Sequence, residues 1–196
     1  MGEQGKPARR MGPPGSDNWH AMLDGAEVIL RDEGHAALTS RRVAEQIGVK
    51  QRLIYYYFHT MDDLIVETFR RLSERELERL RAAGQSGRPL RELWSISVQT
   101  TDPRLISQFM ALANRIEPLA REVIRFIEES RAIQIDALRA AMARSGNEGG
   151  ISPAALAIVA TSVVLTLTRE DQLGISCGHA EVGALIDGFI DRVEPG

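Results

Sequence analysis

The sequence predicts an all-α protein of about nine helices, because apolar residues recur three or four positions apart along most of the chain. Ser, Thr, Asp or Pro stands at the start of many of these segments, and Gly follows several of them, as at helix starts and ends. No segment shows the strict alternation of a half-buried strand, and no phosphate-binding glycine loop or internal repeat is present.

The composition is that of an ordinary soluble globular protein. The chain has 196 residues, of which 43% are hydrophobic and 26% charged, enough for one domain or two small ones. Its one cysteine, Cys177, excludes an intramolecular disulfide framework, and we interpret it as a residue at a helix boundary. The histidines occur singly and no nucleophile motif is visible, so we expect no enzyme, metal or cofactor. They are His20, His35, His59 and His179.

The first 17 residues are rich in Gly and Pro, and we expect a disordered N-terminal arm. Lys6, Arg9 and Arg10 leave open a basic arm that reaches a DNA minor groove; the alternative is an unstructured tail. No signal peptide is visible, and the most apolar region, residues 151–167, contains Ser, Pro and Thr and is expected to fall short of a bilayer-spanning segment. We therefore expect a cytoplasmic protein with no membrane partner.

Residues 18–60 are expected to form the N-terminal domain, with a first helix over 18–33 that ends at Gly34. Thr39 or Ser40 can cap a second helix, and Gly48 follows its last apolar position, where a left-handed residue commonly ends a helix. A third helix is expected to start near Lys50 or Gln51. Two helices around a glycine-containing turn are typical of a helix-turn-helix, whose second helix enters the DNA major groove.

The charge of this segment agrees with DNA binding. Residues 38–60 carry four cations and one anion, whereas the whole chain has a net charge of −3. A basic segment in an acidic protein is typical of a nucleic-acid contact, although a solvated helical hairpin would show the same charge. The four cations are Arg41, Arg42, Lys50 and Arg52.

The residues here also resemble a known family. The pattern Thr39-Ser40-x-x-Val43-Ala44-x-x-Ile47-Gly48-Val49, followed by Ile54-Tyr55-Tyr56-x-Phe58 and Leu64, resembles the tetracycline-repressor (TetR) family of transcriptional regulators. The resemblance covers about residues 26–64 and implies a three-helix DNA-binding domain, a C-terminal helical domain that binds a ligand and dimerises, and no enzymatic activity. Lys50 departs from the family's Ser or Thr and removes a side-chain cap from the third helix.

The resemblance also suggests roles for single residues. By family position Thr39, Ser40, Tyr56 and His59 are expected to contact phosphates, and Arg41 and Arg42 lie on the helix that crosses the DNA backbone. Gln51, Arg52 and Tyr55 are the candidates for base edges, since Arg pairs well with guanine and Gln with adenine. Lys50 heads the recognition helix, where a phosphate could replace the missing cap.

Residues 61–196 are expected to form the ligand-binding and dimerisation domain. Helices are predicted over 61–83, 89–100, from Asp102-Pro103 onward, over 119–144, from Ser152-Pro153 onward, and over about 180–193, with Pro118 forcing a break. We expect an effector pocket among the helices between Met61 and Arg144, and the residues proposed to line it could equally belong to the ordinary core. Arg131 either anchors an anionic effector or reaches solvent. The pocket candidates are Trp94, Phe109, Met110, Phe126, Ile127 and Arg131.

The helix over 151–167 is apolar over more of its surface than one neighbour can cover, which indicates a second partner surface. The resemblance implies a homodimer in which the last two helices of each copy form a four-helix bundle. The interface candidates are Leu156, Val159, Val163, Leu167, Val182, Leu185, Ile186, Phe189 and Ile190.

The sequence thus indicates a homodimeric repressor that binds a palindromic operator in double-stranded DNA and is released by an unknown small-molecule effector. The alternative is a DNA-binding activator or architectural protein without an effector. An enzyme is the least favoured class, for want of a catalytic motif.

Overall fold

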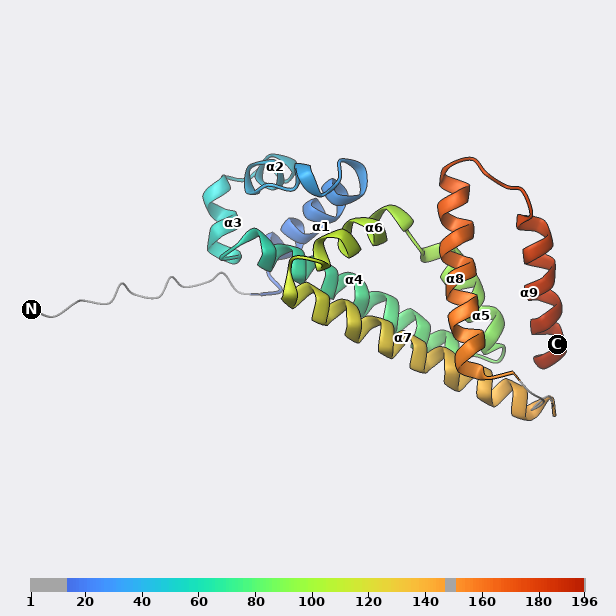
Figure 1. Cartoon of the computed structure of the whole chain (residues 1–196). Helices are drawn as coiled ribbons and strands as arrows, with labels where there is room; N and C mark the ends of the chain where they lie inside the picture. The colour runs from blue at the N-terminus through green and yellow to red at the C-terminus, as the bar shows by residue number, and fades with distance from the viewer. Residues whose placement is uncertain (1–13, 147–150, 196) are drawn as a thin grey trace, which may run out of the picture. The chain divides into compact units, whose positions relative to one another are not determined.

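The computed structural model describes residues 14–146 and 151–195, and within these ranges every regular element is helical. The all-α prediction is therefore confirmed. In chain order the helices are α1 (Asp17–Asp32), a 3-10 turn η1 (His35–Ala37), α2 (Ser40–Gln46), α3 (Gln51–Tyr57), α4 (Met61–Gly84), α5 (Pro89–Thr100), α6 (Pro103–Ala113), α7 (Glu117–Arg144), α8 (Pro153–Gln172) and α9 (His179–Val193) (Figure 1). Lys6, Arg9 and Arg10, the proposed basic arm, lie outside the described residues.

Side-chain caps explain the starts of α1, α2, α4 and α6. The Ser16 hydroxyl accepts from the Trp19 N–H at 3.4 Å, so α1 begins at Asp17. The Asp102 carboxylate accepts from the N–H groups of Arg104 and Leu105 at the start of α6. Helix α7 begins two residues before the predicted start, because a proline is tolerated in the first turn of a helix, where its missing N–H has no partner to lose.

The chain divides into two compact units. Unit 1 contains the described residues up to Arg71 together with Gln108–Ala120, and unit 2 contains Leu72–Ser107 together with the described residues from Arg121 onward. Helices α4, α6 and α7 contribute residues to both.

In unit 1, α1 packs against α2, and α2 against α3. Met22, Leu23, Ile29 and Leu30 of α1 are completely buried. Gly25 permits the close approach of α1 to the end of α2, because a Cβ at this position would lie 2.9 Å from Ile47 Cγ2.

The first part of α4 is tied to α1 within the same unit. The Arg71 guanidinium lies 2.6 Å from the Asp24 carboxylate and 3.7 Å from that of Glu27, and it also donates to the His20 carbonyl. Arg71 is therefore a half-buried cation between two helices, a contact that spacing along one helix cannot reveal.

Unit 2 has its own apolar core, formed by α4, α5, α7, α8 and α9. The buried Glu194 carboxylate after α9 accepts from the N–H groups of Leu90 and Arg91, both at 3.1 Å. These are N–H groups of the first turn of α5, which have no partner inside their own helix. The core consists of Leu80, Ala83, Leu90, Leu93, Ala137, Leu138, Ala141, Met142, Ala157, Ile190 and Val193.

Helix α8 is longer than the sequence interpretation allowed. Over Pro153–Gln172 it is long and apolar enough to cross a membrane by length and composition alone, and little of it is buried in the chain. The expectation that this region is too short for a membrane span was therefore wrong. Its apolar surface needs a cover of some kind, and the same surface was predicted to meet a second copy of the chain.

Candidate nucleic-acid interface

Helices α2 and α3 form a hydrogen-bonded helix-turn-helix (Figure 1). The Thr39 hydroxyl caps α2 by accepting from the Arg42 N–H at 3.1 Å. At the other end Gly48 has φ +70°, its N–H bonds the Glu45 carbonyl, and the Val49 N–H bonds the Ala44 carbonyl. This pair of bonds is a Schellman motif, and the predicted left-handed glycine at the turn is confirmed.

Helix α3 begins at Gln51 without a side-chain cap, as the replacement of Ser or Thr by Lys50 led us to expect. Ile54 and Tyr57 face inward and are buried, and the other side of this short helix is exposed. The exposed residues at its head and along it are Lys50, Gln51, Arg52, Tyr55 and Tyr56.

Ser40 organises two of these exposed side chains. Ser40 is buried, and its hydroxyl oxygen accepts from Gln51 Nε2 at 2.8 Å and lies 3.0 Å from the Tyr55 hydroxyl. The Gln51 amide therefore keeps its carbonyl oxygen and one N–H for another partner. Sequence reasoning assigned Ser40 to a phosphate and did not find this contact, which depends on the angle between α2 and α3.

Two of the four predicted cations already have carboxylate partners. Arg41 lies 2.8 Å from Glu45 on the same helix, and Arg42 makes three hydrogen bonds of 2.6–3.1 Å to Glu33. The Arg42 guanidinium holds the pKa of Glu33 below its usual value, chiefly through these hydrogen bonds. Glu33 lies just before the basic segment, so the charge count over residues 38–60 missed it.

Lys50 and Arg52, by contrast, form no ion pair with any residue that the structure describes. Both are exposed at the head of α3, next to Gln51. The unpaired positive charge among the described residues of this surface therefore lies at the head of the helix that was predicted to read DNA.

The end of α3 is anchored from both sides. The Ser16 hydroxyl donates to the Tyr57 hydroxyl at 3.1 Å, and Phe58 stacks on Trp19 with ring centroids 6.5 Å apart. Beyond the exposed His59, Thr60 and Asp63 exchange hydrogen bonds between side chain and backbone N–H, a capping box that starts α4.

The packing of α1, α2 and α3 and the cationic exposed face of α3 are those of a helix-turn-helix domain of the DNA-binding type. Residues 22–68 match the family model described as "Bacterial regulatory proteins, tetR family". The N-terminal part of this chain is therefore a TetR-family domain, and the resemblance seen in the sequence is confirmed.

Solved structures extend the likeness to most of the chain. A transcriptional regulator from Rhodococcus sp. Rha1 is 17% identical with a TM-score of 0.70, and the match covers 88% of this chain and 95% of that one. A TetR transcription regulator from Haloarcula marismortui is 16% identical with a TM-score of 0.69 and 89% of each chain covered. A regulator of the TetR/AcrR family from Thermobifida fusca is 19% identical with a TM-score of 0.63, covering 92% and 98%. At these identities the likeness shows the fold, and comparison with curated proteins finds no match.

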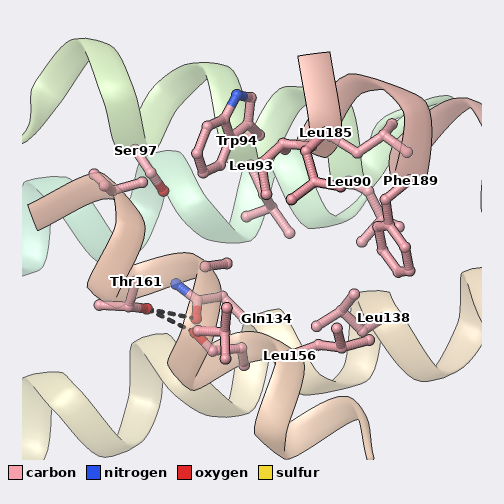
Figure 2. Close-up of a pocket in the computed structure, with 16 residues that line it drawn as sticks. Leu90, Leu93, Trp94, Ser97, Gln134, Leu138, Leu156, Thr161, Leu185 and Phe189 are labelled. Atoms are coloured by element: carbon pink, nitrogen blue, oxygen red, sulfur yellow. Dashed lines mark hydrogen bonds between the residues drawn. The ribbon is translucent and has the colours of Figure 1, made fainter. Parts of the chain in front are cut away.

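The predicted effector residues are not brought together. Only Trp94 lines the apolar cavity of unit 2, which is bounded by α5, α7, α8 and α9 (Figure 2). Phe109 is buried in unit 1, where its ring meets Phe69 edge to face at 5.1 Å, and Met110 of the same helix is exposed. On α7, Ile127 is exposed, whereas Phe126 and Arg131 are half-buried outside the lining of this cavity.

The predicted dimer residues divide by exposure. Val159 is 56% exposed and Leu185 72% exposed, whereas Ile190 is 4% exposed and belongs to the core of unit 2. Ile158 and Leu165 of α8 are also exposed and were not among the candidates. The six remaining candidates are half-buried; they are Leu156, Val163, Leu167, Val182, Ile186 and Phe189.

Proposed function

We propose that this protein is a homodimeric transcriptional repressor that binds a palindromic operator and leaves it when a small-molecule effector binds. The observation that carries the proposal is the exposed face of α3, where Lys50 and Arg52 have no ion-pair partner in the described chain and Ser40 holds Gln51. The TetR-family domain and the family fold support the same function. It requires a cytoplasmic location and no catalytic residue.

Each side chain has a distinct part in this proposal. Arg52, Gln51 and Tyr55 read base edges, and Ser40 acts through Gln51 and Tyr55 by fixing their positions. Thr39, Tyr56, His59 and Lys50 contact phosphates, which set the register of the protein on the duplex without carrying sequence information. Arg41 and Arg42 add phosphate contacts only when they exchange their carboxylate partners for DNA.

A second copy is needed because one reading helix contacts few base pairs. A twofold dimer places two such helices on half-sites about 34–36 Å apart or a multiple of that distance, so the operator is a palindrome or nearly one. The exposed apolar surface of α8 and α9, with Val159 and Leu185, supports pairing through the last two helices. We retain residues 18–60 as the DNA-binding region and 61–196 as the region for effector and dimer contacts.

Effector release follows from a shift of population. The dimer has one arrangement that fits DNA and one that does not. The effector must have the higher affinity for the arrangement that does not fit DNA, since a ligand with equal affinity for both shifts nothing. A coupling of about 1–3 kcal/mol is typical of such systems.

The direct test is to measure DNA binding by the full chain, using the fluorescence anisotropy of labelled duplexes from the regions flanking its own gene. A repressor should bind one palindromic fragment tightly at moderate salt and bind scrambled duplexes only at low salt. Equal affinity for all duplexes would favour the architectural alternative. A chain that binds none of them at low salt would contradict DNA binding altogether.

A further inference from the structure

Four helices of unit 2 line an apolar cavity of about 280 Å³ that is open on one side. Trp94 and Leu93 of α5 lie on one side, Leu138 of α7 and Leu156 of α8 on another, and Phe189 of α9 on a third (Figure 2). Its size lies near the lower end of the range of small-molecule sites, which are mostly apolar with a few polar groups.

The lining contains no charged side chain among the described residues. Its polar groups are neutral and come from Ser97, Gln134 and Thr161. The Thr161 hydroxyl lies 3.2 Å from Gln134 Oε1 and also donates to the Ala157 carbonyl at 2.9 Å (Figure 2). Gln134 Nε2 and the Ser97 hydroxyl have no hydrogen-bond partner in the described chain, so both can bind a guest molecule.

We infer that this cavity is the effector site and that it takes a neutral, mainly apolar molecule with one or two hydrogen-bonding groups. The inference rests on the proposed function and deepens it by naming the class of effector. An anion is excluded because its charge would lose water without gaining a cationic partner. Arg131, which the sequence suggested as an anionic anchor, does not line the cavity.

The residues at the mouth of the cavity explain how a bound ligand can affect the dimer interface. Val159 and Leu185 line the cavity and are also the most exposed of the proposed dimer residues. A second copy on α8 and α9 would therefore cover the mouth, and a molecule in the cavity would contact side chains that face that copy. Ligand binding and the arrangement of the dimer then depend on the same residues.

The charge class can be tested with two dyes that share their rings. N-phenyl-1-naphthylamine is neutral, whereas 8-anilinonaphthalene-1-sulfonate carries a sulfonate on the same ring system. The full chain should bind the neutral dye at least about tenfold more tightly than the anionic dye. Equal or tighter binding of the anionic dye would overturn the inference.

The location can be tested in the same titration. Ala160 lines the cavity, and Ala160→Leu should fill part of it and weaken the neutral dye by about tenfold or more. Ala132 is exposed on α7, and Ala132→Leu is the matched control that should leave the affinity unchanged. Energy transfer from tryptophan to the dye should fall in Trp94→Phe, because Trp94 lines the cavity. An unchanged transfer signal would place the dye elsewhere and overturn the inference even if Ala160→Leu proved unstable.

The operator assay separates this inference from the proposed function. If the wild-type chain binds its operator but shows no cavity-dependent preference for the neutral dye, the effector class is wrong and the DNA-binding function stands. If the dye binds as expected and no duplex is bound, the function is wrong.

Discussion

The Ser40 hydroxyl accepts a hydrogen bond from the Gln51 side-chain amide, with 2.8 Å between Oγ and Nε2. This contact joins the first turn of α2 to the first turn of α3, and the Tyr55 hydroxyl lies 3.0 Å from the same oxygen. A buried residue thus sets the positions of two exposed side chains that we propose to read bases.

Ser40→Ala should weaken operator binding and relax the preference at the base pair read by Gln51, because Gln51 and Tyr55 lose their common partner. Stability should fall by only about 0.5–1.5 kcal/mol, since the two released groups are exposed and can bond to water. Anisotropy with single-base operator variants and urea unfolding measure the two effects. Ser40→Thr, which keeps the hydroxyl, serves as the control, and full discrimination by the alanine variant would contradict the positioning role.

Arg52→Ala should reduce discrimination at one operator position by about 1–3 kcal/mol, as expected for the loss of a direct base contact. The side chain is exposed and lacks an ion-pair partner in the described residues, so the unfolding midpoint should not move. Arg139→Ala is a suitable control, because Arg139 is an exposed cation of unit 2 paired with Asp136. If Arg52→Ala weakens all duplexes equally, Arg52 contacts phosphate and not a base.

Glu33→Gln should strengthen DNA binding, because it removes the carboxylate that holds Arg42. One additional phosphate contact steepens the dependence of log K on log salt by about 0.9. Anisotropy titrations at several salt concentrations give this slope. Glu128→Gln, on the exposed surface of α7, is the control for the change in net charge. An unchanged slope would mean that Arg42 does not reach DNA.

The same ion pair should make the stability of the protein depend on pH, and a comparison of wild type with Glu33→Gln can measure this dependence. Because Arg42 lowers the pKa of Glu33 in the folded chain, the stabilisation is present above the unfolded-state pKa of a glutamate and is lost as pH falls through the lower, folded-state value. The stability difference between the two proteins should therefore be full at neutral pH and disappear in acid. Unfolding curves across that acidic range test this, and a difference that persisted below it would require another cause.

Glu194→Ala should destabilise unit 2 by about 1.5–3 kcal/mol, since two N–H groups at the start of α5 lose a charged acceptor. Glu194→Gln keeps one acceptor oxygen and should lose less. Thermal unfolding followed by circular dichroism would rank the three proteins. An alanine variant as stable as wild type would show that water replaces the carboxylate without loss.

Leu185→Glu should convert the dimer to monomer and weaken operator binding, because it places a charge in the middle of the proposed apolar interface. Leu185 is 72% exposed in the single chain, so the variant should fold normally. Ile124→Glu is the matched control, an exposed apolar residue on α7 outside the proposed face. Sedimentation velocity at micromolar concentration measures the change. A monomeric wild type, or a dimeric Leu185→Glu, would refute the proposed interface.

Local signals predicted the helices well. The helix over Pro89–Thr100 was predicted at its observed bounds, and Gly48 adopts the expected left-handed conformation. Caps, prolines, glycines and apolar spacing act within a few residues of the chain, so they can be read from the sequence directly. The TetR-family pattern is of the same kind, since it lies within one continuous segment.

The candidate sites were predicted less evenly, for a physical reason. Apolar side chains on a helix look alike in sequence whether they are buried, line a cavity or are exposed. Phe109 is buried, Trp94 lines the cavity of unit 2, and Leu185 lines the same cavity but is 72% exposed. Polar partners from other helices were also invisible, as with Glu33 for Arg42 and Ser40 for Gln51.

By itself, then, the sequence determined the helical class, most helix bounds and the family of the DNA-binding domain, because these depend on neighbours along the chain. Only the tertiary structure decided which cations of the basic segment are paired, that Ser40 is buried where α2 meets α3, and that the cavity of unit 2 has a neutral lining. Those properties arise where helices cross, and the positions that meet at a crossing are set by the packing of whole helices.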